Sequence, residues 1–250
     1  DGSVRIAADL RLINQRTLPI AYNGASAQYI INKAAKSQWK SIIDLRQFYF
    51  QIPLEKESRK HTAMQTPIGF LEYCVMPAGC RNGAQTAQLL LERMLRNLRH
   101  AASNYIDDLV VHTMGDFEAH LADLRAVLEK LRSAGLTAHA AKCHFAVDEL
   151  HLLGHVIRDG RVFPGTDKLA AIKNLTGSNI KTKKHVRSAL GLISYFRQFI
   201  PKMAETALPL TALLKKDQPE RVVWTDTCEN ALTVLKSALL SKPCLIAPEF

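Results

Sequence analysis

The stretch that decides the fold is residues 105–111, YIDDLVV, where two adjacent aspartates, Asp107 and Asp108, lie between two short apolar segments. Apolar segments on either side of such a polar pair predict a β-hairpin with the aspartates at its tip. Because successive strand residues point to opposite faces of a sheet, two neighbouring aspartates can converge only at a turn. The sequence therefore predicts two carboxylates held together at one end of a hairpin.

A third aspartate, Asp44, follows Ile42 and Ile43 in a stretch, residues 39–50, that predicts another strand. Carboxylates held close together raise one another's pKa unless a cation neutralises them. Mg²⁺ prefers oxygen ligands, and two such ions can activate a hydroxyl and stabilise a leaving pyrophosphate. The alternative is an inert, solvated Asp-Asp turn. The flanking apolar strands disfavour it because they draw the tip toward a core.

The composition indicates an ordinary globular chain with an excess of positive charge. The 250 residues carry a formal net charge of +10, which favours an anionic partner, with nucleic acid first. A basic protein without such a partner is an equally good interpretation of charge alone. Five cysteines without a CxxC pair disfavour a disulfide framework and predict a reducing, intracellular location. No apolar run is long enough to cross a bilayer.

Apolar spacing and turn residues predict the elements around these aspartates. Residues 67–69 predict a turn and residues 71–76 a strand, and Asp116 is a candidate N-cap. A hairpin is expected around Asp159-Gly160, with residues 150–157 and 161–163 as its arms. Helices are expected over residues 27–36, 85–98, 117–131, 167–175, 183–200 and 227–240. Two helical faces are predicted to be apolar: Leu90, Met94 and Leu98; Phe117, Leu121, Leu124, Leu128 and Leu131.

Six blocks of the sequence resemble the reverse transcriptases of gypsy-type LTR retrotransposons, in the family's order and across nearly the whole chain. The blocks are residues 4–14 (VRIAADLRLIN), 41–52 (SIIDLRQFYFQI), 62–79 (TAMQTPIGFLEYCVMPAG), 105–108 (YIDD), 142–157 (KCHFAVDELHLLGHVI) and 190–201 (LGLISYFRQFIP). A single block of this kind is weakly specific, whereas six in order are very specific.

The resemblance implies an α+β fold, the right-hand polymerase fold with fingers, a palm with an antiparallel sheet, and a helical thumb. Residues 1–163 are expected to form the palm and an N-terminally incomplete fingers region, which interleave. Residues 164–226 are expected to form the thumb, with a boundary near Pro164. Residues 227–250 are expected to begin a connection toward a ribonuclease H domain that the chain does not contain.

The resemblance also implies an activity, that of an RNA-directed DNA polymerase extending a primer with dNTPs. Catalytic and metal-binding roles fall on Asp44, Asp107 and Asp108, with two Mg²⁺ ions, or Mn²⁺ in their place, as cofactors. Contacts to the incoming dNTP fall on Arg5, Tyr49 and Gly79, with Tyr49 as a steric gate against a ribose 2′-OH. Leu153, Gly154 and His155 resemble the hairpin that holds the primer end, and contacts to template-primer phosphates fall on Lys183 and Arg187.

The implied partners are an RNA or DNA template with its primer, dNTPs, and the ribonuclease H and integrase domains of the same Pol polyprotein. No membrane is implied. The implied location is the cytoplasm or a virus-like particle, and the oligomeric state stays open.

The sequence departs from the family pattern after Gly79. Ala84 stands where the family has proline, and Ala87 stands where it has phenylalanine. These changes motivate a different function, a non-catalytic nucleic-acid-binding remnant of a retroelement. An RNA-templated RNA polymerase is a further alternative, which Tyr49 disfavours.

A zinc site is a competing metal hypothesis. His139, Cys143, His151 and His155 have spacings that zinc ligands can adopt. The segment reads as loop, strand and hairpin, and Cys143 and His155 fall on family positions with structural roles. These observations disfavour zinc.

Overall fold

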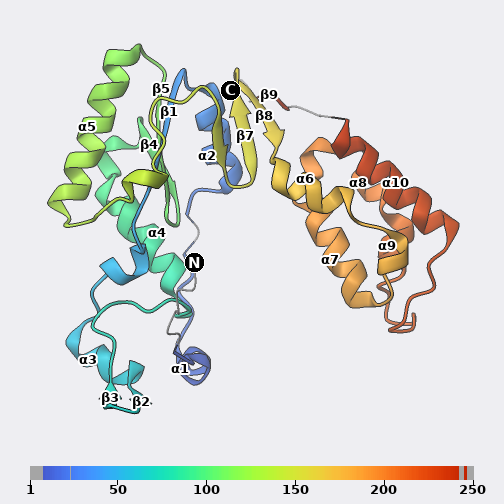
Figure 1. Cartoon of the computed structure of the whole chain (residues 1–250), viewed down its shortest axis with the longest axis horizontal. Coiled ribbons are helices and arrows are strands. Elements are labelled where there is room, and N and C mark those ends of the chain that lie inside the picture. Colours follow the sequence, from blue (N-terminus) through green and yellow to red (C-terminus); the bar gives the residue numbers. More distant parts are fainter. Residues whose placement is uncertain (1–7, 23, 242–244, 247–250) are drawn as a thin grey trace. The chain divides into compact units, whose positions relative to one another are not determined.

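The chain divides into two compact units, Asp1–Asp148 and Glu149–Phe250, in a computed structural model that describes residues 8–22, 24–241 and 245–246. Each unit combines an antiparallel sheet with helices, as the expected α+β class requires (Figure 1). The division falls before the boundary expected near Pro164, because the strands in residues 150–164 pair with one another and with a later strand. The assignment of fingers, palm, thumb and connection stays a prediction.

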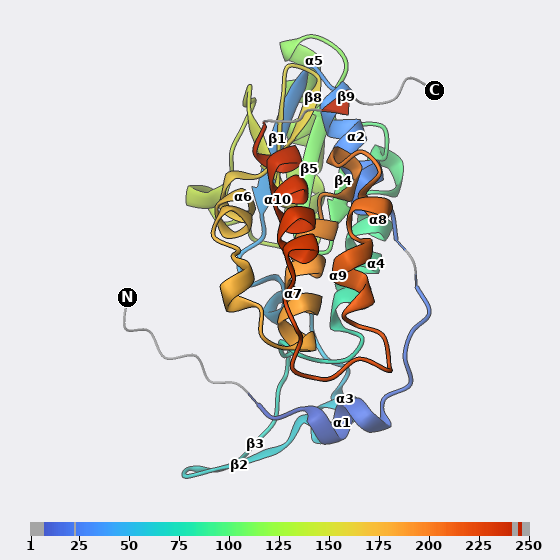
Figure 2. The ribbon, with the colours of Figure 1, turned by 90° about the vertical axis from the view of Figure 1, so that its right-hand side faces the viewer.

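The first unit is built on the three-stranded sheet β1-β5-β4 and a separate ribbon, β2-β3. Its strands are β1 (Trp39–Asp44), β2 (Met64–Thr66), β3 (Gly69–Leu71), β4 (Ala102–Tyr105) and β5 (Asp108–Thr113). Its α-helices are α1 (Arg11–Arg16), α2 (Ala27–Lys36), α3 (Lys56–Arg59), α4 (Gly83–Met94) and α5 (Phe117–Ser133). Figure 2 shows the β2-β3 ribbon at the same end of this unit as α1 and α3.

The strand expected over residues 71–76 is wrong. Strand β3 ends at Leu71 because its partner β2 begins at Met64, directly opposite. Beyond that point Val75 makes a single isolated bridge with Pro53. The turn predicted at residues 67–69 closes the β2-β3 hairpin.

Helices α4 and α5 pack on the same face of the central sheet. Ile43 of β1 pairs with Leu109 of β5, and both are 0% exposed. The face they share is covered by apolar residues of the two helices, among them Leu91 of α4 and Val127 and Leu131 of α5. Full burial of such side chains stabilises a fold by about 1.5–3 kcal/mol each. Asp44 and Asp108 therefore extend from the end of a rigid, fully packed pair of strands.

The N-cap of α5 is confirmed, whereas the predicted apolar face is rotated. The Asp116 side chain accepts a hydrogen bond from the backbone N–H of Ala119 at 2.9 Å. Leu124 and Leu131 are buried as predicted, but Phe117, Leu121 and Leu128 are 40–43% exposed, and Val127, which the prediction left out, is 0% exposed. On α4 the buried apolar residues are Ala87 and Leu91, whereas the predicted Leu90 is exposed and the predicted Met94 and Leu98 are only partly buried against the core.

A chain of buried hydrogen bonds also fixes α5 to the sheet. Ser41 Oγ accepts a hydrogen bond from the backbone N–H of Ala146 at 2.8 Å and is hydrogen-bonded to His120 Nε2 at 2.8 Å. His120 Nδ1 then donates to Thr113 Oγ1 at 2.9 Å, and Thr113 donates to Asp123 at 2.7 Å. Burial lowers the pKa of His120. In the neutral ring that donates from Nδ1, the free Nε2 accepts from the Ser41 hydroxyl.

The second unit contains a four-stranded sheet and a group of helices. The strands are β6 (Leu150–Leu152), β7 (His155–Arg158), β8 (Arg161–Pro164) and β9 (Leu245–Ile246), in the order β6-β7-β8-β9. The helices are α6 (Thr166–Lys173), α7 (Lys183–Ser194), α8 (Met203–Thr206), α9 (Leu208–Ala212) and α10 (Asp226–Leu240). Helix α7 ends earlier than residue 200, where the prediction placed its end.

Two tight hairpins form this sheet where the sequence predicted one. Asp159 and Gly160 have φ values of 50° and 69° in the expected β7-β8 turn. Leu153 and Gly154, with φ values of 47° and 67°, make a second turn between β6 and β7. Positive φ at both central residues is the type I′ geometry that matches strand twist. Residues 150–157 are therefore two strands and not a single arm.

No helix among the residues described here has the length and apolar character needed to span a bilayer.

Candidate active site

The tip of the β4-β5 hairpin carries two of the three expected catalytic carboxylates. Tyr105 pairs with Asp108, so Ile106 and Asp107 form a two-residue turn. Ile106 has a φ of 57°, in the left-handed region that β-branched side chains rarely adopt. Backbone held in such a conformation costs about 1–3 kcal/mol and persists only where surrounding contacts fix it. The turn that places Asp107 beside Asp108 is therefore strained.

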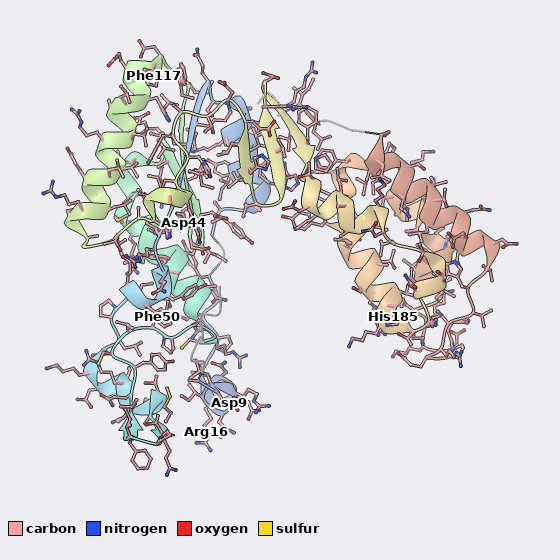
Figure 3. The ribbon with its side chains drawn as sticks, in the orientation of Figure 1. Asp9, Arg16, Asp44, Phe50, Phe117 and His185 are labelled. Carbon is pink, nitrogen blue, oxygen red and sulfur yellow. The ribbon has the colours of Figure 1, made fainter. Side chains whose placement is uncertain are left out.

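Asp44 lies opposite Asp108 in the sheet. Asp44 is the last residue of β1, and the antiparallel register makes Asp44 and Asp108 direct partners. Directly paired residues of neighbouring strands project from the same face, and their side chains are close enough to interact. Figure 3 shows Asp44 at the end of its strand. The sheet thus brings together the three carboxylates that the sequence singled out.

The electrostatics of the site act most strongly on Asp108. Burial, together with the negative charges of Asp107 and Asp44, raises the pKa of Asp108 from 3.8 to about 6. Both causes disfavour the ionised form of this carboxyl group. A bound cation acts in the opposite direction, because it favours three ionised carboxylates.

Tyr49 lies close to this cluster. It belongs to the 3-10 helix η1 (Phe48–Gln51), and its ring rests against Gly83 at the start of α4. A Cβ atom at Gly83 would come within 3.2 Å of Tyr49 Cε1, so the glycine makes room for the ring. Burial raises the pKa of the Tyr49 phenol, and the charge of Asp107 raises it further. The fold therefore brings the expected steric gate near an expected metal ligand.

Gly79 lies in a loop held by asparagine side chains. It has a φ of 92°, and its carbonyl accepts a hydrogen bond from Asn14 Nδ2 at 2.8 Å. Asn14 Oδ1 accepts in turn from the backbone N–H of Arg81 at 2.9 Å. Asn82 binds the main chain of residues 18–20 in the same manner. The sequence pattern included Asn14 and Asn82 without giving either a role, and their loop contacts supply one. The expected dNTP contact Arg5 lies outside the described residues.

A cavity adjoins the hairpin where the sequence departs from the family pattern. It has a volume of about 540 Å³, and its lining includes Tyr105, Ile106 and Ala84. Ala87 is 0% exposed within the core, so α4 packs closely at that position. The two alanines thus differ: Ala87 fills the core, whereas Ala84 borders a hollow.

In the second unit, the β6-β7 turn is held rigidly. The Tyr195 hydroxyl donates to the Leu153 carbonyl, and His155 Nδ1 donates to the same carbonyl at 2.9 Å. His155 is only 4% exposed and packs against aromatic side chains, including Phe196. Leu153 is half-buried and Gly154 is exposed. Of the three residues expected at the primer, His155 therefore supports the turn, while Leu153 and Gly154 present a surface.

The structure gives Lys183 a different place from the one expected. Its side chain is 7% exposed, and its ammonium group donates to the carbonyl of Lys215 at 2.6 Å. A buried cation that caps a main-chain carbonyl does not meet a phosphate on the surface. Arg187, on the same helix, is exposed, as a contact with a phosphate requires.

The donor set of the carboxylate cluster fits a hard divalent cation. Across the described ranges, no three His, Cys, Asp or Glu side chains are grouped closely enough to hold a metal ion by themselves, and this holds for the three aspartates as well. Cys143 Sγ, one of the zinc ligands considered, contacts the main-chain oxygen of His139 at 3.4 Å. The three aspartates supply oxygen ligands, and Mg²⁺ ordinarily completes its shell with water and substrate phosphates. Their chemistry fits a metal whose remaining ligands come from the substrate.

Comparisons with known proteins agree with this geometry. Residues 1–157 match the family model for reverse transcriptase (RNA-dependent DNA polymerase). The chain is 34% identical, over 98% of its length, to the retrovirus-related Pol polyprotein from transposon 297 of Drosophila melanogaster. It is 29% identical, over 98% of its length, to the transposon Tf2-3 polyprotein of Schizosaccharomyces pombe. The chain spans 23% and 18% of the lengths of these relatives.

Solved structures give the same result. A foamy viral protease-reverse transcriptase in complex with double-stranded DNA superposes with a TM-score of 0.90 at 25% identity, covering 100% of this chain and 43% of that one. The enzyme in complex with an RNA/DNA hybrid superposes with a TM-score of 0.82 at 26% identity, covering 94% and 32%. The fold is thus that of the expected right-hand polymerases, and the narrower assignment to gypsy-type elements stays a prediction. The chain belongs to the reverse transcriptase (RNA-dependent DNA polymerase) family.

Proposed function

We propose that this chain is the polymerase core of a retrotransposon Pol polyprotein. It extends the 3′-OH of a primer with dNTPs, using RNA or DNA as template. The observation that carries the proposal is the direct pairing of Asp44 with Asp108 beside Asp107, which gathers three carboxylates at one sheet end. Membership of the reverse transcriptase family supports the same reaction.

Reverse transcriptases use divalent metal ions, and we propose Mg²⁺, with Mn²⁺ as a substitute. When bound, two such ions would activate the primer hydroxyl and stabilise the leaving pyrophosphate. In the proposal Asp44 and Asp107 hold both ions, and Asp108 contributes more weakly. The raised pKa of Asp108 supports this division, because that carboxyl group is the one least readily ionised. The packed strands below the carboxylates keep them in place during the reaction.

Selection of the incoming nucleotide is assigned to Tyr49, Gly79 and Arg5. Tyr49 would crowd a ribose 2′-OH and thereby favour dNTPs, and its nearness to Asp107 supports this role. The forked guanidinium of Arg5 suits triphosphate oxygens. A cavity of about 740 Å³ adjoins the Gly79 loop, and its lining includes the cationic side chains Arg16 and Arg81. Its volume is in the range of small-molecule sites.

Binding of primer and template is assigned to Leu153, Gly154 and Arg187. The complexes of the foamy viral enzyme with double-stranded DNA and an RNA/DNA hybrid support a duplex as the substrate. The net charge of +10 favours such a polyanion. Ribonuclease H and integrase domains of the same polyprotein are proposed partners, because the relatives are Pol polyproteins several times longer. The proposed location is the cytoplasm or a virus-like particle, because the relatives are retrotransposon polyproteins.

The test is extension of a DNA primer on an RNA template with dNTPs and Mg²⁺. Extension that stops when EDTA removes the metal is the expected result. Substitution of NTPs for dNTPs is expected to abolish it, and equal use of both would instead favour an RNA-templated RNA polymerase. Salt-dependent binding of the duplex without any extension would contradict the proposal. That outcome would favour the non-catalytic remnant, which the cavity beside Ala84 and the sequence change there motivate.

A further inference from the structure

Gln88 is a polar side chain on the buried face of α4, and it is hydrogen-bonded to the main chain of the β4-β5 hairpin. The side chain is 6% exposed. Its Oε1 accepts a hydrogen bond from the backbone N–H of Ile106 at 2.5 Å, and its Nε2 donates to the carbonyl of Asn104 at 3.0 Å. Ile106 is the strained residue of the turn, so the amide bonds the main chain at the strained residue and two residues before it.

The orientation of this amide is fixed by its partners. A glutamine amide can be placed either way round, and only the hydrogen-bond network decides between the two. Nε2 faces two atoms that only accept: the Asn104 carbonyl and Glu92 Oε1, the latter at 2.6 Å. Oε1 faces the N–H of Ile106, which only donates. Glu92 therefore keeps Gln88 in the one orientation that holds the turn.

The Glu92 side chain is itself fixed by a further hydrogen bond. The Tyr22 hydroxyl donates to the second carboxylate oxygen of Glu92, and this bond raises the pKa of Tyr22. Gly24 lies directly over the pair: a Cβ atom there would come within 2.8 Å of Glu92 Oε1 and 2.9 Å of Gln88 Cγ. The missing side chain lets the backbone cover both groups. A continuous chain of contacts thus links the Tyr22 segment to the catalytic turn.

We propose that Gln88 is a positioning residue, set by Glu92 and Tyr22, that fixes the strained turn so that Asp107 stays beside Asp44 and Asp108. The inference rests on the proposed polymerase function and adds to it a support remote from the reacting atoms. Burial alone does not require an amide here. An apolar residue of the same size would fill the space and leave the N–H of Ile106 without a partner.

Two measurements on Gln88→Leu test the proposal. The first is single-nucleotide incorporation, where kcat is expected to fall about 10²-fold with a smaller change in KM for the dNTP, the size that misplacement by about 1 Å can cause. The second is hydrogen exchange of the peptide covering residues 105–109, which is expected to speed up at Ile106. Gln28→Leu is the matched control, because Gln28 Nε2 donates to Asn32 four residues on, at 2.8 Å, without touching the hairpin.

Exchanging the amide of residue 88 with the carboxylate of residue 92 tests whether the hydrogen bonds of Gln88, and not only its packing, position the turn. Gln88→Glu places two carboxylates face to face and removes the donor to Asn104, so kcat is expected to fall as in Gln88→Leu. Glu92→Gln is expected to be mild, since the new amide still offers an acceptor. In the double variant the amide of residue 92 donates to the carboxylate of residue 88, which still accepts from Ile106. Recovery of about tenfold over Gln88→Glu alone is expected, a coupling that double-mutant cycles detect between residues in contact.

The outcomes are distinguishable from those of the proposed function. A wild-type chain that extends primers, with Gln88→Leu equally fast and Ile106 equally protected, overturns the positioning role alone. A double variant no better than Gln88→Glu also overturns it, because packing alone predicts no recovery. If the wild-type chain does not extend primers at all, the proposed function fails. Hydrogen exchange at Ile106 then still decides whether Gln88 holds the turn.

Discussion

Two hairpin turns of this molecule each join two antiparallel strands through two residues, and they differ in backbone geometry and in what fixes it. The β7-β8 turn is Asp159-Gly160, with both residues at positive φ. Asp-Gly is among the preferred pairs for this turn, so the local sequence suffices. The β4-β5 turn begins with Ile106 at a φ of 57°, a residue that local preference opposes. Its geometry comes from outside the hairpin, through the buried amide of Gln88.

The difference teaches where the molecule accepts strain. The β7-β8 turn connects two strands, whereas the β4-β5 turn presents Asp107 beside Asp108. Strained backbone persists where the surrounding structure over-determines it, and such places tend to be functional. We therefore expect changes in the β7-β8 turn to act on stability alone and changes in the β4-β5 turn to act on catalysis.

The largest expected effect contrasts the aspartates of the two turns. Asp107→Asn removes a proposed metal ligand and is expected to lower single-nucleotide incorporation by about 10³-fold or more, equivalent to about 4 kcal/mol of transition-state stabilisation. Asp159→Asn is the matched control, since asparagine suits the same turn, and it is expected to retain the wild-type rate. Equal losses in both variants would show that the two turns do not differ in role.

The next effect concerns stability and pH. The pKa of Asp108 is raised from 3.8 to about 6, so the folded protein holds this proton more tightly than the unfolded chain. The stability of the metal-free protein therefore falls as pH rises from about 4 through about 6. Asp108→Asn is expected to raise the unfolding free energy by about 1–2 kcal/mol at pH 7.5, discounted for partial exposure, and to give no gain at pH 4.

Thermal melts at the two pH values measure this effect, with Asp159→Asn as the control. Added Mg²⁺ is expected to narrow the gap between Asp108→Asn and the wild-type chain, because the cation offsets the repulsion. A gain that is the same at pH 4 and pH 7.5 would contradict the assignment of charge repulsion to this site.

A change in stability of similar size and opposite sign is expected from Gly160→Ala in the β7-β8 turn. At a φ of 69° a side chain is unfavourable, and the substitution is expected to cost about 1–2 kcal/mol of unfolding free energy. Chemical denaturation measures the loss, and the extension rate below the melting temperature is expected to be unchanged. A lowered kcat in this variant would contradict the claim that the β7-β8 turn acts on stability alone.

The smallest stability effect is expected from Ile106→Gly in the β4-β5 turn. Relief of backbone strain, about 1–2 kcal/mol, is offset by lost packing and by the conformational entropy of glycine, about 0.5–1 kcal/mol. The melting temperature is therefore expected to stay nearly constant while hydrogen exchange across residues 105–109 accelerates. A large stabilisation would mean that the strain is not balanced by its surroundings.

Much of this contrast could be predicted from the sequence. The Asp159-Gly160 turn, the N-cap at Asp116 and the hairpin around Asp107 follow from local residue types, which act within a few positions. Local residue types do not predict the second turn, at Leu153-Gly154, because leucine gives no turn signal, and only the family resemblance placed a hairpin there. The rotated faces of α4 and α5 could not be predicted, since tertiary packing decides which side of an apolar stripe is buried.

The role of Gln88 was also missed, although a signal was present. Gln88 lies between Ala87 and Leu91 on one helical face, so a buried amide could have been suspected. Its partner, the N–H of Ile106, becomes visible only when the hairpin is folded against α4. For Lys183 the error is the reverse, because the sequence assigned it a role in binding phosphates that its burial does not support. A cluster of cationic residues in the sequence does not reveal which ammonium group donates to a main-chain carbonyl.

The most direct test of the carboxylate site is Mn²⁺ binding followed by electron paramagnetic resonance, with template-primer and a dNTP present. The wild-type chain and Asp159→Asn are expected to bind the ion alike, whereas Asp44→Asn and Asp107→Asn are expected to lose most of this binding. Equal binding by all four proteins would contradict the claim that the sheet end formed by Asp44, Asp107 and Asp108 is the metal site.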